Sequence, residues 1–240
     1  MTISPFGDSA VLINFEQIID AKINARVVAL SNTIMSAMIE GVTFCIPAYC
    51  SITVGFNPGQ IKYSDLVKKI NACHLNDTDH IAKAIPRKIN IPVCYDEEFA
   101  IDRAYVINQT GLSWKKIIDL HTSIEYRVYM LGFIAGFAYM GTLPSPLQCS
   151  RKDTPRMNIP AGTVGIAGLQ TGIYPTKAHA GWQLIGRTPI PVFDSKAKDP
   201  FLFRAGDMVR FYEIDREKYE ATTKEVESGK FDMKNFVKRG

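Results

Sequence analysis

One stretch, residues 157–194, limits what this chain can fold into, because glycine or proline interrupts it every few residues. The apolar runs between these interruptions, such as residues 164–167 and 182–185, are too short to form helices. They are typical of brief strands joined by tight turns. Glycine supplies the positive φ that such turns need, or allows another backbone or a ligand to approach closely. The stretch therefore predicts a small barrel or sandwich of β-strands.

A group of polar residues lies among these turns. Gln170, Thr171 and Tyr174 are bracketed by Gly168 and Gly172, and they could hydrogen-bond an amide or a lactam. The glycines would let backbone N–H groups face a developing negative charge. We take Gln170 and Thr171 as candidate catalytic residues, and Gly168 and Tyr174 as candidate binding residues. The alternative, which the residue chemistry alone favours, is a hydrogen-bonded corner that only stabilises the sheet.

Four basic residues are candidates for binding an anion. Arg151, Lys152 and Arg156 flank Thr154-Pro155, and Arg187 follows a predicted strand. The planar fork of arginine suits the carboxylate or phosphate of a substrate or nucleotide. The alternatives are a solvated basic edge or salt bridges, and a buried arginine needs a partner in either case. We expect Arg156 and Arg187 to bind the anion in preference to Lys152, with Arg151 as a further candidate.

Two histidines and an aromatic loop are further candidates. His121 could act as an acid or base because histidine titrates near neutrality. Its alternative role is that of a residue at a helix C-terminus that interacts with the last carbonyls or packs against the barrel. His179, in a loop, ranks lower. Residues 132–141, GFIAGFAYMG, could cover a cleft or dock a partner, whereas Trp182 is expected to pack in the core.

The composition excludes several classes of protein. The chain has 46% hydrophobic and 22% charged residues, as is usual for globular proteins. A net charge of +4 and the absence of a lysine-arginine run argue against nucleic-acid binding. Five scattered cysteines, none in a CxxC pair, indicate free thiols in a reducing compartment, and no residues have metal-ligand spacing. Without a secretory signal or a membrane-spanning apolar run, we expect a cytoplasmic protein.

Residues 1–86 are expected to form a small α+β domain. A strand at 11–15 precedes an amphipathic helix at 20–38, whose apolar residues recur every three or four positions. Strands at 42–46 and 51–56 follow, and then a second helix that Ser64 could cap. A strand at 88–93, in which Pro92 suggests a sheet edge or a strand end, could belong to either domain. This order of elements is that of a split βαβ unit.

Residues 87–214 are expected to form a mostly-β barrel domain. Two short helices come first, at 101–109 and 114–121, with Gly111 after the first and Ser113 as the cap of the second. A strand at 125–133, the glycine-rich stretch and a last strand at 207–212 would close an all-β barrel. Residues 215–240 are highly charged and predict a surface helix followed by a loose tail.

Three segments carry a family resemblance: TPR at 154–156, IPAGTVGIAGLQTGIYP at 159–175 and GWQLIGRTPIPVFD at 181–194. They closely resemble the 5-oxoprolinase B-subunit family, also described as allophanate hydrolase subunit 1 or the sporulation kinase A inhibitor family. HTSIEYRVYMLGFIAGFAYMGTLP at 121–144 and FGDSAVLINF at 6–15 also fit, so the resemblance covers nearly the whole chain. The family pattern has a histidine at the position of His121, which strengthens the catalytic interpretation of that residue.

The resemblance implies a cyclophilin-like barrel and an activity. It implies one component of an ATP-dependent 5-oxoprolinase, which opens 5-oxoproline to L-glutamate together with its A and C subunits, of which C is the larger. ATP, accompanied by Mg²⁺, would be the cofactor. The chain has neither a Walker loop nor a GxGxxG fingerprint, so barrel turns, basic side chains or a second subunit would hold the nucleotide. Arg156 and Arg187 would then bind phosphate or carboxylate, while Gln170 and Thr171 orient the lactam.

Two other functions remain open from the sequence. One is a protein that binds and inhibits a sensor histidine kinase, through an exposed apolar patch of Phe133, Phe137 and Tyr139. The other is a subunit of an allophanate hydrolase or a urea carboxyltransferase. This second function would require biotin from another chain, because no AMKM-like attachment sequence is present.

Overall fold

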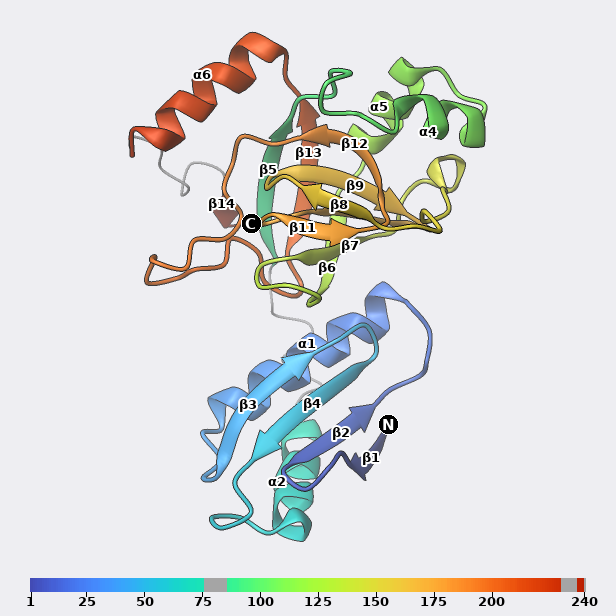
Figure 1. Ribbon diagram of the computed structural model, residues 1–240. Coiled ribbons are helices and arrows are strands. Elements are labelled where there is room, and N and C mark those ends of the chain that lie inside the picture. Colours follow the sequence, from blue (N-terminus) through green and yellow to red (C-terminus); the bar gives the residue numbers. More distant parts are fainter. Residues whose placement is uncertain (76–85, 230–236, 240) are drawn as a thin grey trace. The chain divides into compact units, whose positions relative to one another are not determined.

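The computed structural model describes residues 1–75, 86–229 and 237–239. They divide into two compact units, residues 1–85 and 86–240 (Figure 1). Each unit has a hydrophobic core of its own. Residues 215–229 and 237–239 belong to the second unit.

The first unit is a four-stranded antiparallel sheet with two helices. Its strands lie in the order β1-β2-β4-β3 and span Thr2–Pro5, Ala10–Asn14, Ser51–Phe56 and Val42–Pro47, respectively. Helix α1 (Ala21–Ser36) connects β2 to β3, two strands of the same direction with β4 between them. Helix α2 (Tyr63–Leu75) follows β4 and begins before Ser64, the residue expected to cap it. No strand was expected at β1, which forms a hairpin with β2.

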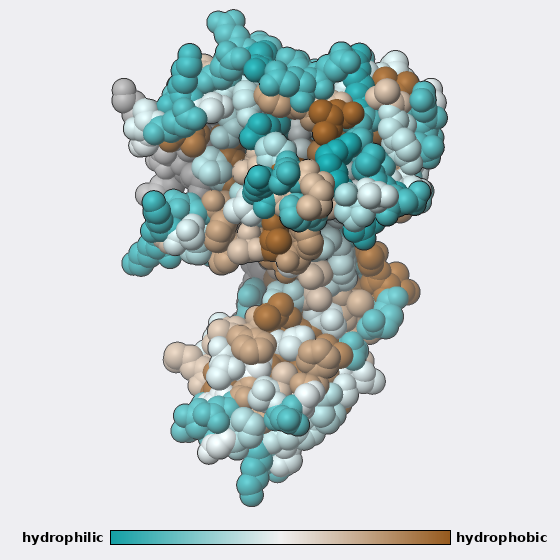
Figure 2. Space-filling view, in the orientation of Figure 1, coloured by the Kyte–Doolittle hydropathy of each residue, from teal (hydrophilic) through white to brown (hydrophobic). Residues whose placement is uncertain are grey.

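Helix α1 begins where the sequence predicts, because the Asp20 carboxylate accepts hydrogen bonds from the backbone N–H groups of Lys22 and Ile23. Its apolar residues then recur on one face, which the helix buries against alternate residues of β2 and β4. This core contains Val11, Ile13, Val27, Leu30, Ile34, Ile52 and Val54, all fully buried. On the other face of the sheet, Phe44 and Ile46 of β3 remain 43% and 50% exposed, and Figure 2 shows apolar surface over this unit.

The second unit is built around an eight-stranded sheet with the strand order β12-β9-β10-β7-β6-β13-β5-β14. In that order the strands span Gln183–Arg187, Thr163–Ala167, Gln170–Ile173, Ala138–Gly141, Tyr126–Leu131, Met208–Glu213, Arg87–Val93 and Val237–Arg239. Strands β8 (Arg156–Ile159) and β11 (Ala178–Ala180) form a separate pair. Most of the glycine-rich stretch is thus built of short strands, as its punctuation predicts.

The seven strands from β12 to β5 curl until the two ends of the series meet at one residue pair. Cys94, just after β5, and Arg187, at the end of β12, exchange both backbone hydrogen bonds at 2.9 Å. Their approach requires glycine at position 186, where a Cβ atom would lie 2.8 Å from the Cys94 carbonyl oxygen. Beyond this isolated bridge β12 and β5 are not paired as strands, so the sheet is a half-barrel and not the predicted closed all-β barrel. Its β5 and β13 run parallel, and helices cover part of it, so the unit is mixed α/β.

Helices α4 (Arg103–Thr110) and α5 (Trp114–Thr122) pack on the core of this sheet. Gly111 ends α4 in the left-handed conformation, with φ of 68°, and Ser113 caps α5 by accepting a hydrogen bond from the backbone N–H of Lys116. A single 3-10 turn, η1 (Ser145–Leu147), follows β7. The helices bury Val106, Ile117 and Ile118 against the strands.

Helix α6 (Arg216–Glu227) begins at Asp215, whose carboxylate accepts a hydrogen bond from the backbone N–H of Lys218. A loose tail was expected after this helix, but residues 237–239 form β14, which pairs with Arg87–Ile89 of β5. Residues 230–236 and 240 of this segment lie outside the described residues. Pro92 falls beyond this pairing and needs no N–H donor toward β14. Within the described ranges, no helix has both the length and the apolarity needed to cross a membrane.

Candidate functional site

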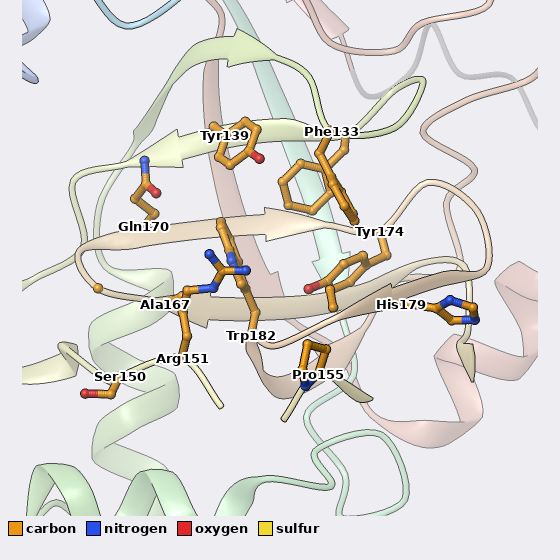
Figure 3. A pocket seen from close by; sticks show the side chains of 13 residues that line it. Phe133, Tyr139, Ser150, Arg151, Pro155, Ala167, Gln170, Tyr174, His179 and Trp182 are labelled. Atoms are coloured by element: carbon orange, nitrogen blue, oxygen red, sulfur yellow. The ribbon is translucent and has the colours of Figure 1, made fainter. Parts of the chain in front are cut away.

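A half-open pocket of about 540 Å³ lies on the second unit, at the glycine-rich stretch (Figure 3). Its walls come from the aromatic loop before β7, from the segment before β8, and from β9, β10 and β11. The residues that line it are Phe133, Phe137, Tyr139, Ser150, Arg151, Pro155, Ala167, Gly168, Gln170, Tyr174, His179, Ala180 and Trp182. This volume is typical of sites for small molecules.

Aromatic rings form one wall of the pocket. The Phe137 ring lies 5.0 Å from Tyr139, 5.2 Å from Tyr174 and 5.3 Å from Trp182, measured between ring centroids. The contacts with Tyr139 and Trp182 are edge to face, a geometry that aromatic pairs prefer. Phe137, Tyr174 and Trp182 are at most 6% exposed, so the wall is rigid. Such a wall suits a flat, partly apolar ligand.

Two polar groups in the pocket are available to a ligand. The Tyr174 side chain is 1% exposed, and its hydroxyl has no hydrogen-bond partner among the described residues. Arg151 is exposed, and within the described chain it has no ion pair or hydrogen bond. In Figure 3 the Arg151 guanidinium and the Tyr174 hydroxyl both point toward the middle of the pocket. Buried polar groups are nearly always satisfied, so the unpaired Tyr174 hydroxyl marks a place for a ligand, and the exposed Arg151 lies beside it.

The electrostatics of the pocket favour an anion. Burial raises the pKa of the Tyr174 hydroxyl, and the nearby Trp182 backbone N–H and the Arg151 charge only partly oppose this. The phenol therefore stays protonated at neutral pH and can donate a hydrogen bond. Gln170 adds an amide at the same wall. Among the lining residues that the structure describes, none carries a carboxylate, so the charge of Arg151 is not compensated within the pocket.

The same residues do not fit a magnesium nucleotide. Arg151 is the one lysine or arginine among the described lining residues, whereas a triphosphate requires several cationic or N–H donors. Carboxylates, the usual protein ligands of Mg²⁺, do not occur in this set. Elsewhere in residues 1–75, 86–229 and 237–239, no group of three or more histidine, cysteine, aspartate or glutamate residues could hold a metal ion.

His121 and Thr171 lie in the interior of the half-barrel and do not line the pocket; both are 0% exposed. The Tyr95 hydroxyl lies at hydrogen-bond distance, 2.7 Å, from Nδ1 of His121, and Nε2 lies 2.9 Å from Oγ1 of Thr171. The Thr171 hydroxyl in turn donates to the Gly165 carbonyl at 3.1 Å. Because the Thr171 proton is used in that bond, Nε2 of His121 must donate to Oγ1. In the neutral imidazole Nδ1 then accepts from the Tyr95 hydroxyl.

The surroundings of His121 agree with that neutral state. Burial lowers the pKa of His121 to about 3, and the ring stacks on Phe211 with 4.6 Å between centroids. A neutral, enclosed imidazole at the end of α5 matches the packing alternative and not the acid–base one. The structure thus places His121 and Thr171, two of the predicted catalytic residues, away from the pocket and enclosed with each other in the core.

Two of the three predicted anion-binding arginines, Arg156 and Arg187, lie outside the pocket. Both terminal nitrogens of Arg156 donate to the Asp102 carboxylate at 2.8 Å. Nε of Arg187 donates to the Ala161 carbonyl at 2.9 Å, and its guanidinium lies over the Phe99 ring. Arg156 thus forms a salt bridge, which was the alternative to anion binding. Arg151 is the predicted arginine that lines the pocket.

The structure brings together Arg151, Gly168, Gln170 and Tyr174, and it adds residues that were not predicted as site residues. Trp182 packs in the core as expected, at 6% exposed, and it also lines the pocket. The aromatic loop, expected only as a possible cover or docking segment, lines the pocket too. The signal for them was present, because bulky aromatics stand beside glycines at 136–139 and 181–182. Ser150 and Pro155 carried no such signal.

Known proteins share the sequence of this chain over most of its length. Residues 1–203 match the family described as carboxyltransferase domain, subdomain C and D. The chain is 39% identical to the 5-oxoprolinase B subunit of Bacillus subtilis (strain 168) over 233 residues, which is 93% of this chain and 97% of that protein. It is 36% identical to the 5-oxoprolinase B subunit of Escherichia coli O157:H7, over 85% of this chain and 92% of that protein.

A solved structure, that of TTHA0988, matches the fold with a TM-score of 0.77 at 32% sequence identity over 86% of this chain. The present chain spans 40% of the TTHA0988 chain. More distantly, it is 22% identical to urea amidolyase of Saccharomyces cerevisiae over 95% of this chain and 14% of that protein. Urea carboxylase of Kluyveromyces lactis shares the fold, with a TM-score of 0.76 at 18% identity.

Proposed function

This chain belongs to the carboxyltransferase domain family, subdomain C and D, within its 5-oxoprolinase B-subunit group, and we propose that it is the B subunit of an ATP-dependent 5-oxoprolinase. The observation that carries this proposal is the 39% identity to the Bacillus subtilis protein over nearly the full length of both chains. The reaction is the opening of 5-oxoproline to L-glutamate, shared with the A and C subunits.

The pocket supplies the groups that 5-oxoproline requires. The ligand is a flat five-membered lactam with one carboxylate. Arg151 binds the carboxylate through a charge-assisted pair, while Tyr174 donates a hydrogen bond to the lactam oxygen and Gln170 pairs with the lactam amide. The aromatic wall covers one face of the ring. Every polar group of the ligand thereby meets a group of opposite hydrogen-bonding character.

In this proposal the chain binds and orients the lactam, and the nucleotide is held mainly by a partner subunit. The described lining residues lack both the donors for a triphosphate and the carboxylates for Mg²⁺. Tyr174 acts as a hydrogen-bond donor because burial raises its pKa. ATP hydrolysis is the source of driving force for opening a stable lactam, and its site lies outside these residues.

The larger C subunit is the partner proposed to cover the pocket. Phe133 lines the pocket and is 58% exposed, and Leu169, between the lining residues Gly168 and Gln170, is 38% exposed. Met157, two residues after the lining residue Pro155, is 62% exposed. Exposed apolar side chains around a half-open site are suited to contact with a second protein surface. The five free thiols agree with assembly in the cytoplasm.

The test is ATP hydrolysis by purified protein with and without 5-oxoproline, first for this chain alone and then with the A and C subunits. We expect turnover that requires 5-oxoproline and all three subunits. If the complete mixture hydrolyses no more ATP with 5-oxoproline than without it, the assignment is wrong.

The kinase-inhibitor alternative loses its structural basis. It relies on an exposed patch of Phe133, Phe137 and Tyr139, but Phe137 is only 2% exposed and belongs to the pocket wall. The carboxyltransferase alternative rests on relatives that are 22% identical or less. A side-by-side assay with urea in place of 5-oxoproline would separate it from the main proposal.

A further inference from the structure

Arg151 lies in a segment that is tied to the half-barrel on both sides. We call residues 149–156 the strap. The Cys149 carbonyl accepts a hydrogen bond from the Gly168 N–H at 2.7 Å, and the Ser150 carbonyl accepts one from the Gln183 side-chain amide at 2.8 Å. The Lys152 N–H donates to the Gly181 carbonyl at 2.7 Å. The backbone on either side of Arg151 is therefore fixed.

The side chains of the strap are tied to one buried carboxylate, that of Asp102. Arg156 donates to both of its oxygens at 2.8 Å, and Nζ of Lys152 lies 3.5 Å from one of them. The backbone N–H of Leu184 in β12 donates to the other at 2.8 Å. Asp102 immediately precedes α4 but makes no side-chain cap to that helix, because its oxygens face the strap and β12.

The number of partners of Asp102 explains why Arg151 is available to a ligand. A carboxylate has about four acceptor positions. Arg156 donates two hydrogen bonds and Leu184 one, and Lys152 forms an ion pair at 3.5 Å, so the charge of Asp102 is neutralised without Arg151. The strap thus contains three basic residues, of which two neutralise Asp102 and the third points into the pocket (Figure 3).

Asp102 must be ionised for this arrangement. It is 5% exposed, and burial raises the pKa of its carboxyl. The hydrogen bonds from Arg156 and Leu184, together with the charges of Arg156 and Lys152, outweigh that effect and lower the pKa below its ordinary value. The same pair raises the pKa of Arg156. The cluster therefore stays charged at neutral pH.

We propose that Asp102 is a positioning residue: by occupying Lys152 and Arg156, it fixes the strap so that Arg151 serves as the pocket's receptor for the ligand carboxylate. The identity of that ligand as 5-oxoproline rests on the proposed function, whereas the link from Asp102 to Arg151 does not. Misplacing a binding group by about 1 Å costs up to about 100-fold. Asp102→Asn, which keeps the shape and removes the charge, should weaken carboxylate binding about 10- to 100-fold.

The experiment compares binding of 5-oxoproline with binding of its uncharged carboxamide by the full chain, measured by calorimetry. Wild type should prefer the acid, and both Arg151→Ala and Asp102→Asn should lose that preference. The double variant should lose no more than Arg151→Ala alone, because Asp102 acts through Arg151.

Asp207→Asn is the matched control. Asp207 is 4% exposed and binds Arg87 with two hydrogen bonds in the same unit, but neither residue lines the pocket. This control should retain the preference for the acid even if it lowers stability. The proposal is overturned if Asp102→Asn keeps the preference, or if its effect adds to that of Arg151→Ala.

A second readout separates this proposal from the proposed function. Nitrogen-15 NMR follows the Arg151 Nε–H signal while acetate is added as the probe. In wild type and Asp207→Asn the signal should shift with acetate, and in Asp102→Asn the shift should be lost. If wild type binds acetate at Arg151 but not 5-oxoproline, the substrate assignment fails and the positioning role stands. An Arg151 signal that responds equally in Asp102→Asn would disprove the positioning role.

Discussion

The two faces of β10 carry neighbouring residues of very different character. Thr171 faces the interior of the half-barrel, where it is 0% exposed, whereas Gln170, one residue earlier, lines the pocket on the other side. Successive residues of a strand point to opposite faces. Two residues that look like one polar motif in the sequence therefore belong to two separate environments.

The environments differ in how completely their polar groups are paired. On the interior side, Tyr95, His121 and Thr171 form a chain of hydrogen bonds that ends at a backbone carbonyl. On the pocket side, Tyr174 is as deeply buried, but its hydroxyl has no described partner. A fully satisfied hydrogen-bond network stabilises one arrangement of the core. A buried hydroxyl without a partner in the protein is suited to a hydrogen bond with a ligand. Altering each face should therefore affect different measurements.

The largest effect is expected from Arg151→Ala on the pocket side. Loss of a charged pair to the substrate should reduce kcat/KM for 5-oxoproline about 100-fold, equivalent to about 3 kcal/mol. Stability should change by less than about 0.5 kcal/mol, since the side chain is exposed. The measurements are steady-state kinetics of the reconstituted complex and thermal unfolding of the chain. The kcat/KM of Arg151→Lys, which keeps the charge without the planar guanidinium, should lie between those of wild type and Arg151→Ala. If Arg151→Ala has the kcat/KM of wild type, Arg151 does not bind the substrate.

On the interior side, Thr171→Val should lower the free energy of unfolding by about 2 kcal/mol. The substitution leaves Nε2–H of His121 without an acceptor in the core. Denaturant unfolding gives the free energy, and Thr171→Ser, which retains the hydroxyl, is the control. Affinity of the folded protein for 5-oxoproline should stay unchanged. A loss of affinity without a loss of stability would instead place Thr171 in the site.

Because of the buried His121, the free energy of unfolding should also decrease in mild acid. His121 has a folded-state pKa of about 3 against an ordinary 6.5, so between these values the unfolded chain binds a proton that the folded chain does not. The stability that the neutral ring contributes is complete above pH 6.5 and is lost as the pH falls toward 3. The loss should reach about 2 kcal/mol at about pH 5.

The measurement compares unfolding at about pH 7 and about pH 5. In His121→Gln, whose side chain does not titrate, the difference between the two pH values should shrink by about 2 kcal/mol, whatever the absolute stability of the variant. An equal pH dependence in wild type and variant would show that His121 already titrates normally in the folded protein.

The smallest effect is expected for Tyr174→Phe. Because the hydroxyl has no described protein partner, its removal should change stability by less than about 0.5 kcal/mol. Affinity for 5-oxoproline should fall about fivefold, equivalent to about 1 kcal/mol, through loss of one hydrogen bond to the lactam. Calorimetric titration measures the affinity. A marked loss of stability would reveal an internal partner for the hydroxyl and weaken the distinction between the two faces.

Local chemistry made much of the fold predictable. Asp20 and Ser113 mark the starts of α1 and α5, and Gly111 marks the end of α4, because caps act within a few residues of the chain. Arg151 and Tyr174 were among the candidates because of residue chemistry, the fork of arginine and a polar cluster between glycines, and the structure places both in the pocket.

What could not be predicted depends on contacts distant in sequence. Arg156 was assigned to a ligand, but its partner Asp102 lies 54 positions away. His121 and Thr171 are 50 positions apart, and only the structure shows that they are hydrogen-bonded to each other in the core. Strand β14 pairs with β5 across most of the second unit. The spacing of residues in the sequence does not reveal such pairings. Polar residues with and without a hydrogen-bond or ion-pair partner in the protein therefore cannot be told apart from the sequence.

The parallel pairing of β5 with β13 has a consequence for how the protein is made. Residues 87–93 find their partner only at residues 208–213, so during synthesis β5 leaves the ribosome long before the strand that pairs with it. The first unit, whose strands all lie within residues 2–56, meets no such delay. The second unit must hold an unpaired, apolar strand until more than a hundred further residues have been added. Slow translation through this region prolongs the exposure of β5 to aggregation and to chaperones.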